Sequence, residues 1–152
     1  MSVAEICNRE VVTAEKHTSI AEAAKIMRRT HTGSLVIVDS DAPKSKPVGI
    51  ITDRDLVIEV IAKDEEVTGL TVGDVMGPEL LISRGNDGIW ETILRMRAMG
   101  VRRMPVIDDN DGFLMGILSM DDLLEFLASE LSDLTKLIKR EAGREKETRP
   151  AI

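Results

Sequence analysis

An internal repeat constrains this chain more than any other feature, because a duplicated unit decides the architecture before any single residue does. Three blocks of the first half recur in the second half in the same order. Residues 20–27 align with 89–96 and 35–39 with 104–108 at an offset of 69, and 48–56 align with 115–123 at an offset of 67. Chance does not readily produce three blocks in one order, so we predict two homologous halves.

Each half shows the same predicted order of elements: strand, helix, strand, strand, helix. Ile20, Ala23 and Met27 recur at helical spacing behind Thr18 or Ser19 as an N-cap, and short β-branched runs indicate buried strands. In the first half we predict a strand at 11–14, a helix at 19–30, strands at 35–38 and 48–52 around a loop at 39–47, and a helix at 53–62. In the second half we predict strands at 80–83, 104–108 and 113–119, a helix at 87–99 and another from 121. The expected fold class is α/β or α+β.

The length of 152 residues suits two small repeats that share a core. A unit of about 60 residues alone has a marginal core, so we expect the halves to bury their apolar strand faces against each other and to form a cleft between them. We assign residues 1–62 to the first domain, 63–71 to a polar linker, 72–130 to the second domain and 131–152 to a C-terminal extension.

The charge is unevenly distributed. The whole chain carries 20 basic and 27 acidic side chains, a net −7, and residues 136–152 carry six basic and three acidic ones, which leaves about −10 on the rest. An acidic body disfavours nucleic acid and anionic membranes as partners. Any anion must therefore be bound by a few well-placed cations and backbone N–H groups.

Cysteine and histidine are too scarce for a disulfide or a zinc cluster, since Cys7 is the single cysteine and His17 and His31 are the only histidines. We expect no metal, and a reducing cytoplasm as the location. The longest apolar runs are about five residues, too short to span a membrane.

The pattern Gly-x-x-Thr/Ser-x-x-Asp occurs twice, at 49–55 and at 116–122. We call these the first and second signatures. Thr52 and Ser119 each end a strand beside the free N–H groups of a helix start, where a hydroxyl can donate to a phosphate. Asp55 and Asp122 follow three residues later, on the same face, where a carboxylate can accept both hydroxyls of a ribose. The combination indicates a nucleotide site, although the same spacing also forms a capping box that only starts a helix.

Two arginines offer positive charge near this site. Arg102 and Arg103 stand at the entrance of the predicted strand 104–108, and their guanidinium groups suit a phosphate. The alternative is a solvated pair bridged to Asp or Glu. Arg54, inside the first signature, is a weaker phosphate candidate. Because the second signature lacks a cation there, we rank the Asp55 site above the Asp122 site.

These motifs resemble a tandem pair of CBS domains, the two-repeat unit called a Bateman module. The resemblance covers about residues 3–130 and is supported by Val3–Ile6, Val72–Met76 and Arg103–Asp108. It implies two β-α-β-β-α repeats related by pseudo-two-fold symmetry, with adenosine nucleotides in the cleft and phosphates reached by the residues at the position of Arg102 and Arg103. It also implies an apolar adenine slot, lined by Val12 and Val48 in one site and by Leu81 and Met115 in the other.

The predicted last helix extends past the repeat and carries an apolar stripe. Leu123, Leu127, Leu131, Leu134 and Ile138 are spaced 4, 4, 3 and 4 residues apart. A second subunit could cover this stripe, and in the resembled family such modules commonly form a dimeric disc; the alternative is packing back on its own domain. Charges and Pro150 predict fraying from residue 140 to 152.

Markers of common enzyme classes are absent from the sequence, including phosphate-binding loops and nucleophile elbows. We therefore predict no catalytic residues. The expected function is that of a sensor that binds AMP, ADP or ATP between the repeats and transmits a conformational change to a separate effector protein. The alternatives are a dimeric interaction scaffold without a physiological nucleotide, or a sensor of S-adenosylmethionine or NAD.

Overall fold

The computed structural model describes residues 1–40 and 43–149. Two residues of the predicted loop 39–47, and Pro150 with the two residues after it, lie outside the described residues. The chain divides into two compact units, Met1–Ser119 and Met120–Ile152. The first unit contains the whole first repeat and the second repeat as far as Ser119.

The predicted order of elements is confirmed, with shifted boundaries. The first repeat consists of α1 (Val3–Ile6), β1 (Thr13–Glu15), α2 (Ile20–Thr30), β2 (Ser34–Val38), β3 (Pro47–Thr52) and α3 (Asp53–Leu56), which continues as the π-helix η1 (Val57–Ile61). The second repeat consists of α4 (Val72–Val75), β4 (Ser83–Arg84), α5 (Ile89–Met99), β5 (Arg103–Ile107) and β6 (Leu114–Ser119). The second unit is α6 (Met120–Thr148). The mixed α/β class is therefore correct.

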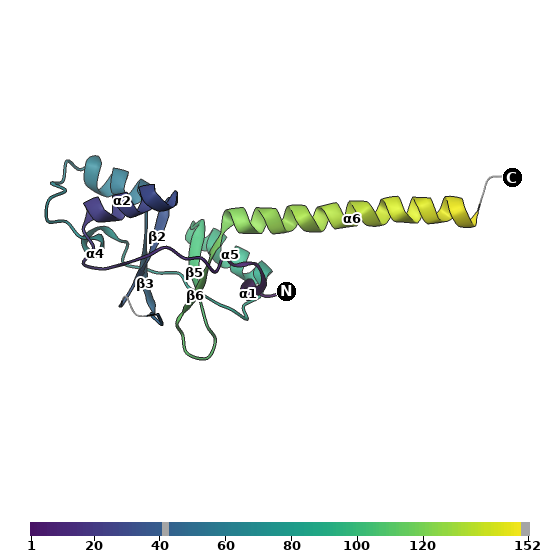
Figure 1. The fold of residues 1–152 in the computed structure, drawn as a ribbon, viewed down its shortest axis with the longest axis horizontal. Coiled ribbons are helices and arrows are strands. Elements are labelled where there is room, and N and C mark those ends of the chain that lie inside the picture. Colours follow the sequence, from purple (N-terminus) through teal and green to yellow (C-terminus); the bar gives the residue numbers. More distant parts are fainter. Residues whose placement is uncertain (41–42, 150–152) are drawn as a thin grey trace. The chain divides into compact units, whose positions relative to one another are not determined.

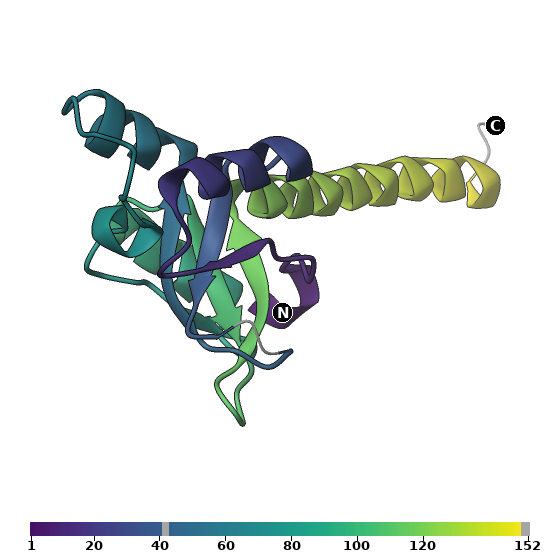
Figure 2. The same ribbon diagram turned by 60° about the vertical axis from the view of Figure 1, so that its left-hand side comes forward.

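The two sheets have the same topology, as expected for a repeat. In the sheet β1-β2-β3, β1 runs parallel to β2 and β3 runs antiparallel to it, and the sheet β4-β5-β6 repeats this arrangement. Thr13 pairs with Val36 and Ser83 with Val106. The sheets lie side by side, with β3 next to β5 (Figures 1 and 2).

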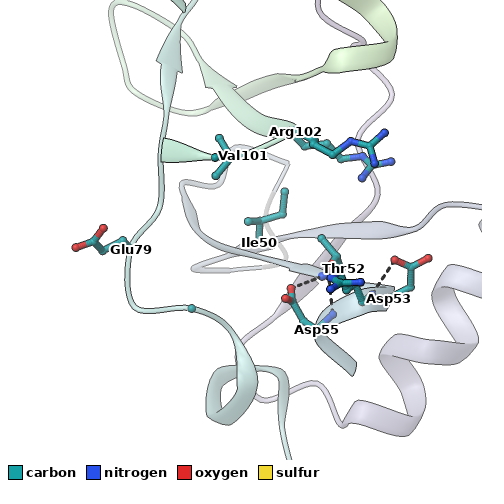
Figure 3. Close-up of a pocket in the computed structure, with 11 residues that line it drawn as sticks. Ile50, Thr52, Asp53, Asp55, Glu79, Val101 and Arg102 are labelled. Carbon is teal, nitrogen blue, oxygen red and sulfur yellow. Dashed lines mark hydrogen bonds between the residues drawn. The ribbon is translucent and has the colours of Figure 1, made fainter. Parts of the chain in front are cut away.

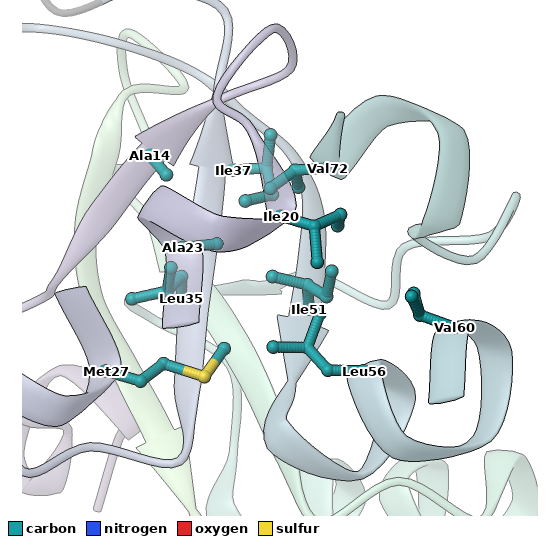
Figure 4. Packing of buried hydrophobic residues seen from close by; sticks show 10 residues of the cluster. All are labelled: Ala14, Ile20, Ala23, Met27, Leu35, Ile37, Ile51, Leu56, Val60 and Val72. Carbon is teal, nitrogen blue, oxygen red and sulfur yellow. The ribbon is translucent and has the colours of Figure 1, made fainter. Parts of the chain in front are cut away.

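The core of the first repeat forms where α2 packs on its sheet (Figure 4). The Ser19 hydroxyl caps α2 by accepting from the backbone N–H of Glu22, as the sequence predicted. Leu35 and Ile37 of β2 belong to this core, while Val36 points to the opposite face by strand alternation and is also fully buried. Strand β2 is therefore covered on both faces, which explains its uninterrupted apolar sequence.

The repeats exchange their entrance segments. Helix α1 precedes the first sheet but packs on β4 and β6, and Asn8 and Ile117 exchange two backbone hydrogen bonds of 2.9 Å. Near α4, Val72 donates to the carbonyl of Thr18 and Gly73 to that of Lys16, both at 2.8 Å. Residues 63–71 lie between η1 and α4, and the exchanged segments join residues 1–119 into one compact unit.

This exchange explains the glycine at the start of each signature. A Cβ atom on Gly116 would lie 2.8 Å from the backbone oxygen of Asn8 and 2.8 Å from Sγ of Cys7. A Cβ atom on Gly49 would lie 2.5 Å from Sδ of Met76. The entrance segment of one repeat thus crosses directly over the signature of the other, with a backbone oxygen against Gly116 and a flexible side chain against Gly49.

Helix α6 is one continuous helix of 29 residues (Figure 1). The prediction of fraying from residue 140 is therefore wrong as far as Thr148, because acidic residues in the first turn and a lysine in the last match the helix dipole. Leu131, Leu134 and Ile138 are each more than half exposed. No helix in the described part of the chain is both long and apolar enough to cross a membrane.

Candidate functional site

A cavity of about 410 Å³ in the first unit is built from both repeats (Figure 3). The first repeat contributes Ile50, Thr52, Asp53, Arg54 and Asp55, and the second contributes Gly77, Glu79, Gly100, Val101, Arg102 and Arg103. The structure thus brings together five residues that the sequence singled out: Thr52, Arg54, Asp55, Arg102 and Arg103.

Strand β3 and the start of α3 form one wall of this cavity. Along β3, Ile51 points into the first core, so its neighbours Ile50 and Thr52 point to the other face and are only half-buried. Thr52 is the last residue of the strand and the N-cap of α3. This geometry presents the Thr52 hydroxyl and the first helical turn to the cavity.

Thr52 and Asp55 form a capping box. The backbone N–H of Asp55 donates to Oγ1 of Thr52 at 3.2 Å, and the backbone N–H of Thr52 donates to Oδ2 of Asp55 at 2.8 Å. The capping interpretation is therefore correct, yet it does not exclude a ligand. The hydroxyl hydrogen of Thr52 and Oδ1 of Asp55 take no part in the two hydrogen bonds of the capping box. Both side chains line the cavity.

The opposite wall carries Arg102 and Arg103, at the entrance of β5. In the described part of the chain, neither arginine forms an ion pair with a carboxylate, and the same holds for Arg54. The alternative of a pair bridged to Asp or Glu is therefore not what the structure contains. Figure 3 shows Val101 and Arg102 across the cavity from Thr52 and Asp55. The cavity combines three guanidinium groups with the carboxylates of Asp53, Asp55 and Glu79.

The apolar walls differ from those that the family resemblance implied. Val12 and Val48 pack against the core of the first repeat, and the described lining of the cavity offers Ile50 and Val101 instead. The reason is the exchange of entrance segments, which brings residues 77–79 of the second repeat to the first signature. Val12 and Val48 are therefore not among the described lining of this cavity, and the slot predicted from them stays a prediction.

The residues proposed for the other slot lie apart from this cavity. Met115 lines a separate cavity of about 210 Å³ together with Arg9, Val11, Thr13, Pro43, Ser45 and Leu114. Leu81 is half-buried and precedes β4. Ser119 ends β6, and Asp122 lies in the first turn of α6. The boundary between the two compact units falls inside this second signature, after Ser119, so its two halves are described in separate units.

Six lining residues were not predicted: Ile50, Asp53, Gly77, Glu79, Gly100 and Val101. Strand alternation from Thr52 could have found Ile50, and Val101 directly precedes the two arginines. Gly77 and Glu79 carry no local signal, because only the crossing of the entrance segments brings them to the cavity. Among the described residues, no three His, Cys, Asp or Glu side chains are grouped so that they could hold a metal ion.

The comparison with known families identifies the class of protein. The sequence matches the model of the CBS domain over residues 3–62 and 72–129. Because these two matches span most of the chain, it belongs to the CBS-domain family, as a tandem pair. The resemblance seen in the sequence is confirmed.

Similar proteins come from archaea and bacteria. The Methanopyrus kandleri protein MK0525 is 33% identical over 144 residues, which cover 93% of this chain and 71% of that protein. The CBS domain-containing protein YhcV of Bacillus subtilis is 30% identical over 80% of this chain and 82% of its own length. Among solved structures, the CBS domain pair of protein MJ0100, in complex with 5′-methylthioadenosine and S-adenosyl-L-methionine, is 25% identical, with a TM-score of 0.73 over 86% of this chain and 98% of that one.

Proposed function

We propose that this protein is a non-catalytic sensor that binds an adenosine nucleotide, AMP, ADP or ATP, in the cavity between its two repeats. Binding changes the angle between repeats or subunits of a homodimer, and a separate effector protein responds to that change. A cytoplasmic location fits a chain with a single cysteine, which cannot form a disulfide within itself.

The main support for this proposal is that hydroxyl, carboxylate, guanidinium and apolar side chains line one cavity. A hydroxyl and a carboxylate from the first repeat face two arginines from the second, with Ile50 and Val101 beside them. A volume of about 410 Å³ lies in the range of small-molecule sites. The composition suits a ligand with a sugar, an anion and a flat apolar part.

Each group has a role in the proposed complex. Asp55 accepts hydrogen bonds from the ribose hydroxyls, and Thr52 donates its hydroxyl hydrogen to a phosphate oxygen. Arg102 and Arg103, with Arg54 at the edge, neutralise the phosphates. Ile50 and Val101 contact the adenine. Among the described residues that line the cavity there is no paired base and nucleophile, so we propose binding without catalysis.

The phosphate of the proposed nucleotide distinguishes it from the ligands bound by a similar protein. The MJ0100 pair is in complex with 5′-methylthioadenosine and S-adenosyl-L-methionine, which have sulfur in place of the 5′-phosphate. Three arginines without a carboxylate partner in the described chain favour a phosphorylated ligand here. Calorimetry against AMP, ADP, ATP, S-adenosylmethionine and NAD would rank these ligands directly.

Thermal shift tests the site. A nucleotide at 100 times its dissociation constant adds about 2.7 kcal/mol of stability to the folded protein. We expect Asp55→Ala to abolish this shift for AMP and ATP while the variant remains folded, with its own baseline lowered by about 1 kcal/mol through loss of the capping box.

Asp122→Ala is the matched control, because it removes the corresponding carboxylate of the second signature and should leave most of the shift intact. An undiminished shift in Asp55→Ala would defeat the assignment of the first signature. No shift for any adenosine ligand in the unmodified protein would favour the interaction scaffold instead.

A further inference from the structure

Helix α6 carries an exposed row of apolar side chains at coiled-coil spacing. Leu124, Leu127, Leu131, Leu134 and Ile138 follow one another at intervals of 3, 4, 3 and 4 residues, so they share one face of the helix. Four of the five are 56–65% exposed, and Leu127 is half-buried. A row of this kind is stabilised when a second helix covers it.

The charges of α6 are separated along its length. Residues 120–135 contain five acidic side chains and no basic one, a net −5, whereas residues 136–149 contain six basic and three acidic ones, a net +3. Two such helices placed in parallel set like charges side by side. Two antiparallel helices set the acidic half of each against the basic half of the other.

We propose that α6 pairs in antiparallel orientation with α6 of a second copy of this chain. The surface forms the contact of the homodimer proposed above and does not depend on the nucleotide. In the register that interlocks the two rows, Leu127 lies level with Ile138 of the second copy, and Leu131 lies level with Leu134. These pairs occur twice by symmetry and give four apolar layers.

The same register also brings opposite charges to the same level, which supports the antiparallel choice. Glu125 lies level with Arg140 of the second copy, and Asp121 lies level with Arg144, again twice by symmetry. In a parallel pair, the acidic residues 120–135 of the two copies would lie at the same level, and so would the mainly basic residues 136–149. The distribution of charge therefore selects the orientation as well as the occupant.

Sedimentation equilibrium of the full chain tests the surface. We expect the unmodified chain to form dimers, and the double variant Leu131→Glu/Leu134→Glu to raise the dimer dissociation constant by at least about 100-fold. Ser132→Glu adds a charge beside the row without entering it, and should leave the constant nearly unchanged. A monomeric unmodified chain, or a double variant that dimerises normally, would overturn the proposal.

Salt dependence tests the orientation. Raising the ionic strength should weaken the dimer, because salt screens the attraction between the acidic half of one helix and the basic half of the other, whereas a parallel pair would be strengthened by the same change. In a Cys7→Ala background, oxidation of a mixture of Leu127→Cys and Ile138→Cys chains should give disulfides between the two kinds of chain. Disulfides only between identical chains would indicate parallel helices and refute the orientation.

The nucleotide shift measured in the same variants separates the two proposals. Loss of the dimer with an intact AMP or ATP shift supports the α6 surface alone. An intact dimer in Asp55→Ala, with the shift lost, supports the nucleotide site alone.

Discussion

The first and second signatures share their spacing and differ in their charge. Between the hydroxyl and the acid, the first signature has Asp53 and Arg54, whereas the second has Met120 and Asp121. The difference extends to the opposite repeat: Arg102 and Arg103 face the first signature, while the aligned positions of the first repeat are Gly33 and Ser34. The two repeats therefore share the hydroxyl and the acid at the start of a helix, and they differ in the charged side chains around that pair.

This difference shows that a binding site in a repeat protein belongs to neither repeat alone. The first signature supplies the hydroxyl and the carboxylate, and the second repeat supplies two of the cations. A repeat can therefore lose the charges that its partner needs while its own fold stays intact. Variants at corresponding positions of the two repeats test this difference.

The largest expected effect concerns the glycines that begin the signatures. We expect Gly116→Ala to lower the free energy of unfolding by about 2–3 kcal/mol, because the new methyl group meets the backbone oxygen of Asn8, which cannot move alone. Gly49→Ala should lose only about 1 kcal/mol, because it meets the flexible thioether of Met76. Urea denaturation measures both, and equal losses would contradict the role of the crossing backbone.

An effect of similar or smaller size concerns the arginines that only the second repeat carries. The double variant Arg102→Ser/Arg103→Ser should weaken ATP binding about 10- to 100-fold, since charge-assisted hydrogen bonds to phosphate are lost. Stability without ligand should change little, because neither arginine forms an ion pair in the described chain. Calorimetry measures the affinity, and Arg97→Ser on α5 serves as a control outside the cavity. Unchanged ATP affinity in the double variant would remove the phosphate role.

The smallest expected effect concerns the turn before each long helix. In the second repeat, Asp87 accepts hydrogen bonds of 2.9 Å from the Ser83 hydroxyl, the Arg84 backbone N–H and the Arg95 side chain. Burial alone would raise the pKa of Asp87, but these three donors lower it below its ordinary value. In the described part of the chain, the hydroxyl of the aligned Thr18 in the first repeat accepts a hydrogen bond from the backbone N–H of Glu15 at 3.2 Å.

A lowered folded pKa means that the ionised Asp87 stabilises the protein above the ordinary aspartate pKa of about 3.9, and that this contribution is lost as the pH falls through the folded value. Asp87→Asn should therefore lose about 1 kcal/mol at pH 7, and its deficit should shrink below about pH 4. Thermal unfolding at pH 7 and pH 3 measures this change. Thr18→Ala should show a deficit that does not depend on pH over that range; a constant deficit in Asp87→Asn would contradict the assignment.

Local spacing was sufficient to predict much of the fold and part of the site. The helical recurrence of Ile20, Ala23 and Met27 led to α2 with its Ser19 cap, and the three-residue interval between Thr52 and Asp55 led to a paired hydroxyl and acid at a helix start. These features depend on neighbours in the chain, whose geometry is set by the backbone period. The continuation of α6 to Thr148 does not follow from local spacing, because dense charges and Pro150 at the end of the chain are typical of a fraying helix end.

The apolar lining of the cavity could not be predicted from neighbours in the sequence. Val12 and Val48 are placed correctly on or beside strands, yet they pack on the first core, while Glu79 and Val101 of the other repeat line the cavity. The lining depends on how α1 and α4 cross onto the opposite repeats. That crossing has no sequence pattern beyond Gly49 and Gly116, whose meaning appears only when their close neighbours are known.

The duplication, the order of strands and helices, and the capping pair of Thr52 and Asp55 follow from the amino-acid sequence alone, because each depends on periodicity or on contacts within a few residues. Which repeat completes which site, and which side chains face the cavity, depend on the tertiary structure. Hydrogen bonds and close packing between segments about 50 to 110 residues apart, such as those of Val72 with Thr18 and of Asn8 with Ile117, require the whole arrangement of both repeats.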